Sequence, residues 1–407
     1  MEFCGIVAPG DTMNYQFSAA MRDMKPSAIR EIFKSLGQPG AISLAAGNPA
    51  PESFPADRMA KVAADIFASN ATAALQYGTT EGYAPLRELV SERLKTRFGV
   101  DTDANMTVIT SGGQQAIELT CKTLCDAGDV VICENPSFIG ALNAFRSLGA
   151  RPVGVELEAD GMSIDGLEAA LKANPRAKLI YVIPTFQNPA GLTTSLQKRQ
   201  AIYELARRYD VVILEDNPYG DLRFAGEDVP TIKSLDTDGR VVYCGTFSKI
   251  LSAGMRVGFV CGNEELIQKM VVAKQVEDVH TNQFFQMLCA NFMQQYDLDE
   301  HIAFIRDLYR QKCACMLGAL DTYMPSCVQY TRPQGGLFLW CTLPSQIAMP
   351  DFVAEAAEHR VFVVPGNTFN ADLTAPSQSF RLNYSTPSIE QIRDGVAVLG
   401  QIVQQKL

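Results

Sequence analysis

The middle of the chain, from about Val108 to Gly262, alternates short apolar runs with longer stretches in which apolar residues recur every three or four positions. The apolar runs are rich in Val and Ile and predict five strands, at Val108–Thr110, Val130–Cys133, Leu179–Ile183, Val211–Leu214 and Val241–Cys244. The longer stretches predict helices over Gln114–Leu124, Phe138–Leu148 and Leu196–Tyr209. Strands that are apolar throughout are buried on both faces, so the pattern indicates an α/β fold with a mainly parallel sheet covered by helices on both faces.

The two ends of the chain follow a different pattern. One amphipathic stretch, Ser27–Leu36, precedes a segment rich in Gly and Pro over residues 45–55. Beyond about residue 290, helical stretches mix with alternating runs such as Gly336–Trp340 and Arg360–Val364, which is typical of a smaller α+β domain. We therefore expect an N-terminal arm and joining segment over residues 1–50, a large domain over 51–290 and a small domain over 291–407.

Composition and charge narrow the classes of function. The 407 residues carry 35 Lys and Arg against 45 Asp and Glu, and this net charge of −10 argues against whole-chain affinity for nucleic acid or an anionic membrane. No apolar run is long enough for a membrane helix, and Met1–Tyr15 lacks the features of a secretory signal. The eleven cysteines are odd in number and widely spread, which predicts reduced thiols in a cytoplasmic protein. The three histidines are far apart in the sequence, and no metal site is expected.

Polar and aromatic side chains follow each predicted strand of the central region. In chain order they are Ser111, Gly112, Gly113 and Gln114, then Phe138, Asn188, Asp216 with Tyr219, and finally Thr246, Ser248, Lys249 and Arg256. Ligands of an open α/β sheet bind beyond the carboxyl ends of its strands, so we expect these side chains to form one site.

These residue types match the chemical needs of pyridoxal phosphate (PLP). Lysine forms Schiff bases with aldehydes, and PLP is an aldehyde, so Lys249 is the candidate attachment point. Asp216 would supply the anion opposite the pyridine nitrogen. Asn188 and Tyr219 would donate hydrogen bonds to the ring oxygen, and Phe138 would cover the ring face.

The phosphate of PLP would need backbone N–H groups, hydroxyls and a guanidinium. The helix start at Gly112–Gln114 offers the N–H groups, and Thr246, Ser248 and Arg256 offer the side chains. Each of these features also has an ordinary structural interpretation. Ser111–Gln114 fits a capped helix start, Arg256 a surface ion pair, and Asp216 a helix cap.

Seven blocks of the sequence together resemble one family. Four carry the expected site: Asn188-Pro-x-Gly191, Asp216-x-x-Tyr219, Ser248-Lys249 and Arg256-x-Gly258. They are similar to the PLP-dependent aminotransferases of fold type I, in the class I and II group. Pro26–Arg30, Leu75–Tyr83 and Arg381–Ser385 resemble the branch that contains the 2-aminoadipate and kynurenine aminotransferases. The resemblance runs from about residue 17 to the C-terminus, and seven blocks in order are very specific.

The resemblance implies a role for each matching residue. Lys249 would bind PLP covalently and, once freed by substrate, would move a proton between the substrate Cα and PLP. Arg381 would bind the substrate α-carboxylate with two parallel hydrogen bonds, and Gly47 would lie against the substrate. Tyr77 would reach the phosphate bound by the neighbouring subunit, which implies a homodimer, although it also fits a core tyrosine.

Two positions bear on substrate preference. Arg30 matches a position that in this branch helps to hold the distal end of the substrate side chain, although it also fits a solvated helix face. Asn48 departs from the apolar residue expected there and places an amide near the pocket. The resemblance also predicts cis peptide bonds at Asn135–Pro136 and Asn188–Pro189.

The predicted function is amino transfer from an L-amino acid to a 2-oxo acid, with 2-oxoglutarate expected as the acceptor, by a ping-pong route. Amino acids with long acidic, basic or aromatic side chains are favoured. One alternative is another PLP reaction, β-elimination or decarboxylation, because those enzymes share Lys249, Asp216 and Arg381. The other is a PLP-binding regulatory protein, for which the stretch before residue 77 offers too little basic sequence.

Overall fold

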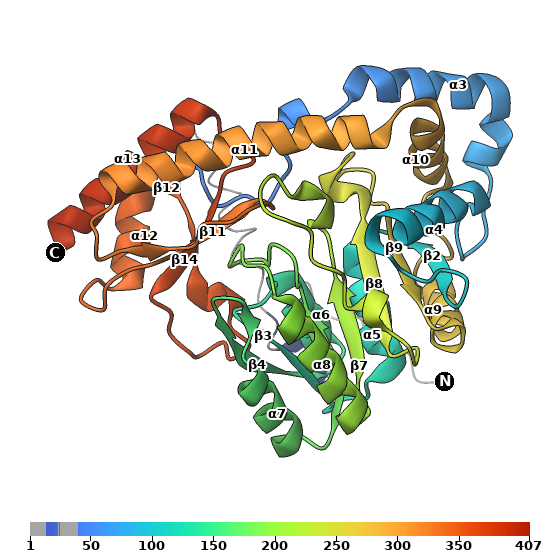
Figure 1. Ribbon diagram of the computed structural model, residues 1–407, viewed down its shortest axis with the longest axis horizontal. Coiled ribbons are helices and arrows are strands. Elements are labelled where there is room, and N and C mark those ends of the chain that lie inside the picture. Colours follow the sequence, from blue (N-terminus) through green and yellow to red (C-terminus); the bar gives the residue numbers. More distant parts are fainter. Residues whose placement is uncertain (1–13, 23, 25–39) are drawn as a thin grey trace, which may run out of the picture.

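The structure, a computed structural model, describes residues 14–22, 24 and 40–407 (Figure 1). The expected amphipathic stretch Ser27–Leu36 lies outside the described residues. The strands are β1 (Ile42–Ser43), β2 (Met106–Thr110), β3 (Val130–Asn135), β4 (Arg151–Glu158), β5 (Gly161–Met162), β6 (Ala177–Val182), β7 (Val212–Asp216), β8 (Val241–Thr246), β9 (Gly258–Gly262), β10 (Gln329–Tyr330), β11 (Phe338–Thr342), β12 (Val361–Phe362), β13 (Val364–Pro365) and β14 (Ser379–Asn383).

The α-helices are α1 (Ala19–Arg22), α3 (Ala56–Leu75), α4 (Ala84–Phe98), α5 (Gly113–Leu124), α6 (Ile139–Ser147), α7 (Ile164–Ala173), α8 (Leu196–Tyr209), α9 (Glu264–Glu277), α10 (Gln283–Gln295), α11 (Leu298–Tyr323), α12 (Met349–Glu358) and α13 (Ile389–Lys406). Short 3-10 helices are η1 (Pro51–Ser53), η2 (Gly220–Leu222), η3 (Lys233–Leu235), η4 (Phe247–Lys249) and η5 (Gly366–Phe369).

The large sheet has the strand order β2-β9-β8-β7-β6-β3-β4-β5. Its centre, from β8 to β4, is parallel, which confirms the predicted mainly parallel sheet. Strand β9 is antiparallel to both β8 and β2, so β2 runs in the same direction as β8. The carboxyl ends of β2, β3, β6, β7 and β8 therefore meet at one edge. The sequence pattern does not predict β9, because its three inner residues between two glycines form too short an apolar run.

Helices cover both faces of this sheet because alternate strand residues point to opposite sides. Val130 and Ile132 of β3 pack in one cluster with apolar residues of α7 and α8. Val131 and Cys133, the residues between them, pack in the other cluster with residues of α5 and α6. Figure 1 shows α7 and α8 in front of the strands. The predicted helix over Leu196–Tyr209 coincides with α8.

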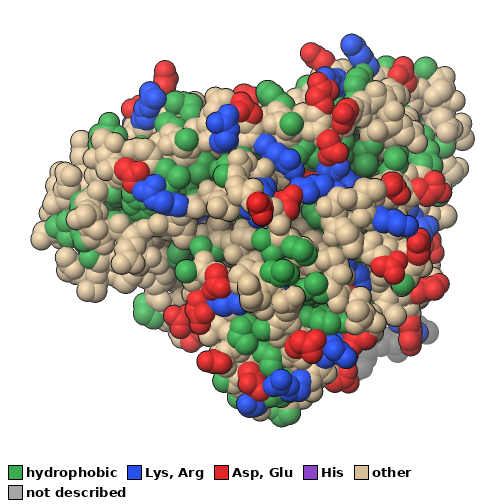
Figure 2. Space-filling view, viewed as in Figure 1, with side chains coloured by type: hydrophobic (Ala, Val, Ile, Leu, Met, Phe, Trp, Pro, Cys, Tyr) green, Lys and Arg blue, Asp and Glu red, His purple; other side chains and the backbone are tan. Residues whose placement is uncertain are grey.

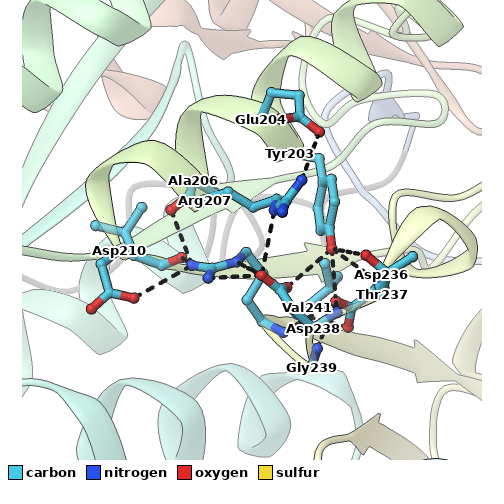
Figure 3. A network of polar contacts seen from close by, with 12 residues as sticks. Tyr203, Glu204, Ala206, Arg207, Asp210, Asp236, Thr237, Asp238, Gly239 and Val241 are labelled. Carbon is cyan, nitrogen blue, oxygen red and sulfur yellow. Dashed lines mark hydrogen bonds and ion pairs between the residues drawn. The ribbon is translucent and has the colours of Figure 1, made fainter.

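A polar network holds the loop that leads into β8 (Figure 3). The carboxylate of Asp236 accepts the backbone N–H groups of Gly239, Arg240 and Val241, at 2.9 to 3.1 Å. The hydroxyl of Tyr203 in α8 donates to Asp238 at 3.0 Å and accepts the N–H of Thr237 at 2.8 Å. The network fixes the start of the strand whose far end leads to Lys249.

A second, antiparallel sheet with the order β10-β11-β14-β13 lies toward the C-terminus, together with α12 and α13. The prediction of a single strand over Arg360–Val364 is wrong. Val361 and Phe362 form β12 and pair with β1, whereas Val364 pairs with Arg381 of β14. The apolar run is divided because its two ends belong to different sheets.

Helix α11 connects the two regions. It has 26 residues, and Figure 1 shows it extending along the molecule from α10 to α13. The boundary that we expect near residue 290 falls inside α10, whose helix continues to Gln295. Within the described ranges, no helix combines the length and apolar character needed to cross a membrane. Basic and acidic side chains are interspersed over the face shown in Figure 2.

Candidate active site

A pocket of about 300 Å³ lies at the sheet edge where the parallel strands end, and it extends to the second sheet. The sequence-predicted residues that line it are Gly47, Asn48, Gly113, Gln114, Phe138, Asn188, Asp216, Tyr219, Thr246, Ser248, Lys249, Arg256 and Arg381. Residues separated by more than 300 positions in the chain therefore meet in one site. Ser111, Gly112 and Tyr77 do not line it, and Arg30 lies outside the described residues.

Lys249 is placed by η4, the short helix that directly follows β8. Its Nζ donates a hydrogen bond to the carbonyl oxygen of Gly47 at 3.0 Å. Burial lowers the pKa of Lys249 to about 8, and the positive charges of Arg256 and Arg381 act in the same direction. A neutral amine, which is the form that attacks an aldehyde, is therefore accessible close to neutral pH.

Asp216 is the last residue of β7, and its side chain is almost completely buried, with 5% of the residue exposed. The hydroxyl of Tyr181 in β6 donates to its Oδ2 at 2.7 Å, and the thiol of Cys244 in β8 is a second donor. Burial raises the pKa of Asp216 to about 6, although the two donors and the charge of Lys249 oppose that shift. The carboxylate is thus ionised at neutral pH and can hold a cation in the pocket. Sequence reasoning missed Tyr181 and Cys244, because both lie within apolar strand runs.

Arg381 lies in β14, and only 2% of its surface is exposed. Its Nη1 donates to Asn188 Oδ1 at 2.8 Å and its Nη2 donates to the carbonyl of Ala45 at 2.7 Å. The guanidinium stacks over the ring of Phe338, 4.2 Å from its centre, and Nε has no partner among the described residues. Burial lowers the pKa of Arg381 to about 10, so the group keeps its charge at neutral pH. A fixed, charged guanidinium with unused N–H donors is suited to bind a carboxylate.

The loop that carries Asn188 contains one of two cis X–Pro bonds. Both Asn135–Pro136 and Asn188–Pro189 are cis, which confirms that prediction. Asn188 also forms a side-chain hydrogen bond with Tyr219, whose ring contacts Phe338 edge-on at 5.9 Å between centres. Phe138, at the start of α6, completes the aromatic part of the lining.

A cluster of donors lies beside Lys249, at the start of α5. Arg256 Nη1 donates to Ser248 Oγ at 3.2 Å, and Arg256 Nη2 lies 3.4 Å from the carbonyl of Ser111. The hydroxyl of Thr246 donates to Ser248 Oγ at 2.9 Å. Gly112 has φ +80°, and a Cβ atom there would lie 2.1 Å from Arg256 Nη2, so a side chain at this position would displace the guanidinium. Hydroxyls, a guanidinium and a helix start form an anion cradle.

Ser111 and Tyr77 have surroundings outside the pocket, whereas Asn48 lines the pocket with an exposed side chain. The hydroxyl of Ser111 donates to Asp278 at 2.6 Å, behind the cradle. Tyr77 is 81% exposed and makes an edge contact with His280. The side chain of Asn48 is exposed at the pocket, and its carbonyl accepts hydrogen bonds from Ser385 and Thr386.

The donor set fits PLP. The anion cradle can bind its phosphate, and the ionised Asp216 can pair with its protonated ring nitrogen. The lowered pKa of Lys249 makes the neutral amine available to react with its aldehyde. Gly112 and Gly113 bring no side chain into the cradle. A Cβ at Gly112 would occupy the space beside the Arg256 guanidinium.

Comparisons with known proteins agree with this fit. The family described as aminotransferase class I and II matches residues 39–399. The chain is 39% identical over 402 residues to the aromatic-amino-acid aminotransferase 1 of Thermococcus litoralis, covering 97% of this chain and 96% of that one. It is 38% identical over 384 residues to the 2-aminoadipate transaminase of Thermus thermophilus, covering 94% of each.

A solved structure shows the same similarity in three dimensions. It is the Pyrococcus horikoshii kynurenine aminotransferase in complex with PMP, with a TM-score of 0.92 and 38% identity, covering 96% of this chain and 97% of that one. The fold is that of the fold type I enzymes, and the cofactor is PLP. The chain therefore belongs to the class I and II aminotransferases, and it is a PLP-dependent transaminase.

Proposed function

We propose that the enzyme transfers the amino group of L-amino acids with long acidic, basic or aromatic side chains to 2-oxoglutarate by a ping-pong route. Three relatives with 38–39% identity support this range, since their names refer to aromatic amino acids, 2-aminoadipate and kynurenine. The observation that carries the proposal is the meeting of three groups in one pocket: the amine of Lys249, the carboxylate of Asp216 and the guanidinium of Arg381.

Each residue has a proposed part in the reaction. When bound, PLP supplies an aldehyde carbon that accepts the amino group and a conjugated ring that withdraws electrons from the substrate Cα. Lys249 Nζ holds the cofactor and then moves a proton at the substrate Cα, for which its lowered pKa suits it. Asp216 stabilises the charge of the ring nitrogen, and Arg381 orients the substrate by its α-carboxylate.

The remaining lining residues hold the cofactor in place. We assign the phosphate to Thr246, Ser248, Arg256 and the start of α5 at Gly113 and Gln114. Asn188 and Tyr219 would donate to the ring oxygen, and Phe138 would cover the ring. The hydroxyl of Ser111 is bonded to Asp278 and its backbone N–H to Gln115 Oε1, so Ser111 would shape the cradle without donating to the phosphate.

Substrate arrival would affect the segment at residues 45–48. The carbonyl of Gly47 accepts from Lys249 Nζ, and the carbonyl of Ala45 accepts from Arg381 Nη2. Attachment of PLP would take up Lys249 Nζ, and the α-carboxylate of a substrate would take up Arg381, so the two binding events would each compete with one contact to the same short segment. Asn48, at the end of that segment, lines the pocket, and its amide would favour a substrate with a polar distal group.

We further propose that two copies of the chain form a homodimer. Tyr77 is 81% exposed and Leu75 is 75% exposed, so large apolar side chains are exposed together in this segment. In a dimer these residues would be covered, and Tyr77 would reach the neighbouring active site. We also propose a three-part division of the chain at residues 1–50, 51–290 and 291–407, and a cytoplasmic location.

The test is a panel of L-amino acids assayed with 2-oxoglutarate and ranked by kcat/KM. We expect 2-aminoadipate, kynurenine and the aromatic amino acids to exceed alanine, with glutamate as the second product. Release of ammonia or carbon dioxide without glutamate would instead indicate a lyase or a decarboxylase. A ranking led by short amino acids would overturn the proposed substrate class.

A further inference from the structure

The carboxylate of Asp216 is held by two neighbours that the reaction scheme does not use. Tyr181 lies in β6 and Cys244 lies in β8, on either side of Asp216 in β7. Tyr181 donates to Asp216 Oδ2 at 2.7 Å, and Cys244 is the direct partner of Asp216 in the register of β7 and β8. Two strands thus bring one donor each to the same carboxylate.

Both donors are fixed in position. Tyr181 is fully buried, and its ring contacts Phe145 of α6 edge-on at 5.5 Å between centres. Cys244 is also fully buried, and its thiol has a second acceptor, the carbonyl of Gly113 at the start of α5, to which Sγ donates at 3.6 Å. The Tyr181 hydroxyl is therefore the stronger donor to Asp216, whereas the thiol of Cys244 divides its one proton between Asp216 and the carbonyl of Gly113.

Neither donor loses its proton near neutral pH. Burial raises the pKa of the Tyr181 hydroxyl and that of the Cys244 thiol well above their ordinary values, and the charge of Asp216 raises them further. The other titratable groups that interact with Asp216 are Lys249 of η4, Tyr219 and Glu134. Burial raises the pKa of Glu134, at the end of β3, to about 8, so Glu134 is largely neutral at pH 7.

We infer that Tyr181 and Cys244 are positioning residues that keep the buried Asp216 ionised, and thereby able to hold the protonated ring of PLP, at neutral pH. A carboxylate removed from water favours its neutral form unless donors compensate for the lost hydration. Hydrogen bonds to the ionised form provide that compensation, and here they come from neutral groups that add no charge to the pocket. The inference rests on the proposed role of Asp216.

The test measures cofactor binding rather than turnover. The probe is 4′-deoxypyridoxine 5′-phosphate, which has the ring and phosphate of PLP but no aldehyde and so does not react with Lys249. Its dissociation constant for the apoenzyme is measured from pH 5 to 9. In the wild type we expect binding to weaken as the pH falls through about 6, where Asp216 gains its proton.

In Tyr181→Phe this midpoint should rise by about one to two pH units, the shift that corresponds to one hydrogen bond to a charged group. At pH 6 the variant should bind the probe roughly tenfold more weakly than the wild type, and at pH 9 the two should agree. Cys244→Ala should shift the midpoint in the same direction by less, because a thiol is a weaker donor. It also provides the test if Tyr181→Phe does not fold.

Matched controls separate this role from a structural one. Tyr309→Phe removes another fully buried hydroxyl, which accepts the N–H of Ala50, and Cys289→Ala removes another fully buried thiol. Neither control should move the midpoint. In an Asp216→Asn background no carboxylate remains to titrate, so Tyr181→Phe should have no effect on the pH profile.

An unchanged midpoint in Tyr181→Phe and Cys244→Ala overturns the inference. Equal shifts in the control variants overturn it as well, and so does a shift that persists in the Asp216→Asn background. None of these results depends on the substrate panel. If the panel fails while the midpoints shift as expected, the proposed substrates are wrong and the role of the two donors stands.

Discussion

Arg381 offers the sharpest test of how the enzyme recognises its substrates. Two of its five N–H donors are used by Asn188 and Ala45, and Nε has no partner among the described residues. The unused donors suffice for two charge-assisted hydrogen bonds to an α-carboxylate, each worth about 1.5–3 kcal/mol. Their loss should cost about 3–6 kcal/mol, or roughly 10² to 10⁴ in kcat/KM.

The variants Arg381→Leu and Arg381→Lys separate charge from geometry. The leucine variant should show the full loss, whereas the lysine variant keeps the charge without two parallel bonds and should recover part of the rate. The assay is the rate of the first half-reaction with phenylalanine and with phenylethylamine, which lacks the carboxylate. Only phenylalanine should be affected, since phenylethylamine reacts slowly with every form. Equal loss with both compounds, or a loss below threefold with phenylalanine, would refute the assignment.

Four further predictions address the other parts of the site. Borohydride reduction followed by peptide mapping should place the cofactor on Lys249, and a label on another lysine would contradict its role. Asp216→Asn should keep PLP but lose roughly 10² to 10³ in kcat, as for other electrostatic contributions to catalysis; near-normal turnover would show that the carboxylate is only structural. Gly112→Ala should weaken PLP binding at least about tenfold in equilibrium dialysis, given its positive φ and the clash with Arg256. Gly254→Ala, where a Cβ would meet nothing closer than 3.7 Å, is the control that should bind normally. Arg30→Ala should lower the ratio of kcat/KM for 2-aminoadipate to that for alanine, and an unchanged ratio would show that Arg30 does not contact the substrate.

The elements that the sequence predicts well are those whose burial leaves a simple pattern. The helices α5, α6, α7 and α8 bury both faces of the central strands. These strands are therefore continuous apolar runs, and such runs predict strands directly. The order of those strands along one edge then places Lys249, Asp216 and Asn188 together. Strand β9 has no such signal, and β12 and β13 share one run although they pair with different partners.

The parts of the site that could not be predicted depend on register and on side-chain direction. Tyr181 and Cys244 carry no motif, and only the alignment of β6, β7 and β8 brings their donors to Asp216. Ser111 is predicted as a cofactor-binding residue, but its hydroxyl donates to Asp278, a partner that no motif indicates. The contacts of Gly47 and Ala45 to Lys249 and Arg381 are made by backbone carbonyls, which a sequence does not display.

Helix α11 is long enough for a small rotation at one end to produce a large displacement at the other. With 26 residues at 1.5 Å per residue it is about 39 Å long. A rotation of about 5° at its first turn therefore displaces its last turn by about 3 Å, which is as long as a hydrogen bond. That first turn is capped by Asp297, whose carboxylate accepts the N–H groups of Asp299 and Glu300. Contacts along the helix oppose such a rotation, because side chains are buried from Leu298 to Leu320 and Lys312 donates to the carbonyl of Ser385 at 2.8 Å. A change at one end of α11 is therefore passed to the segments that pack along it rather than to its far end alone.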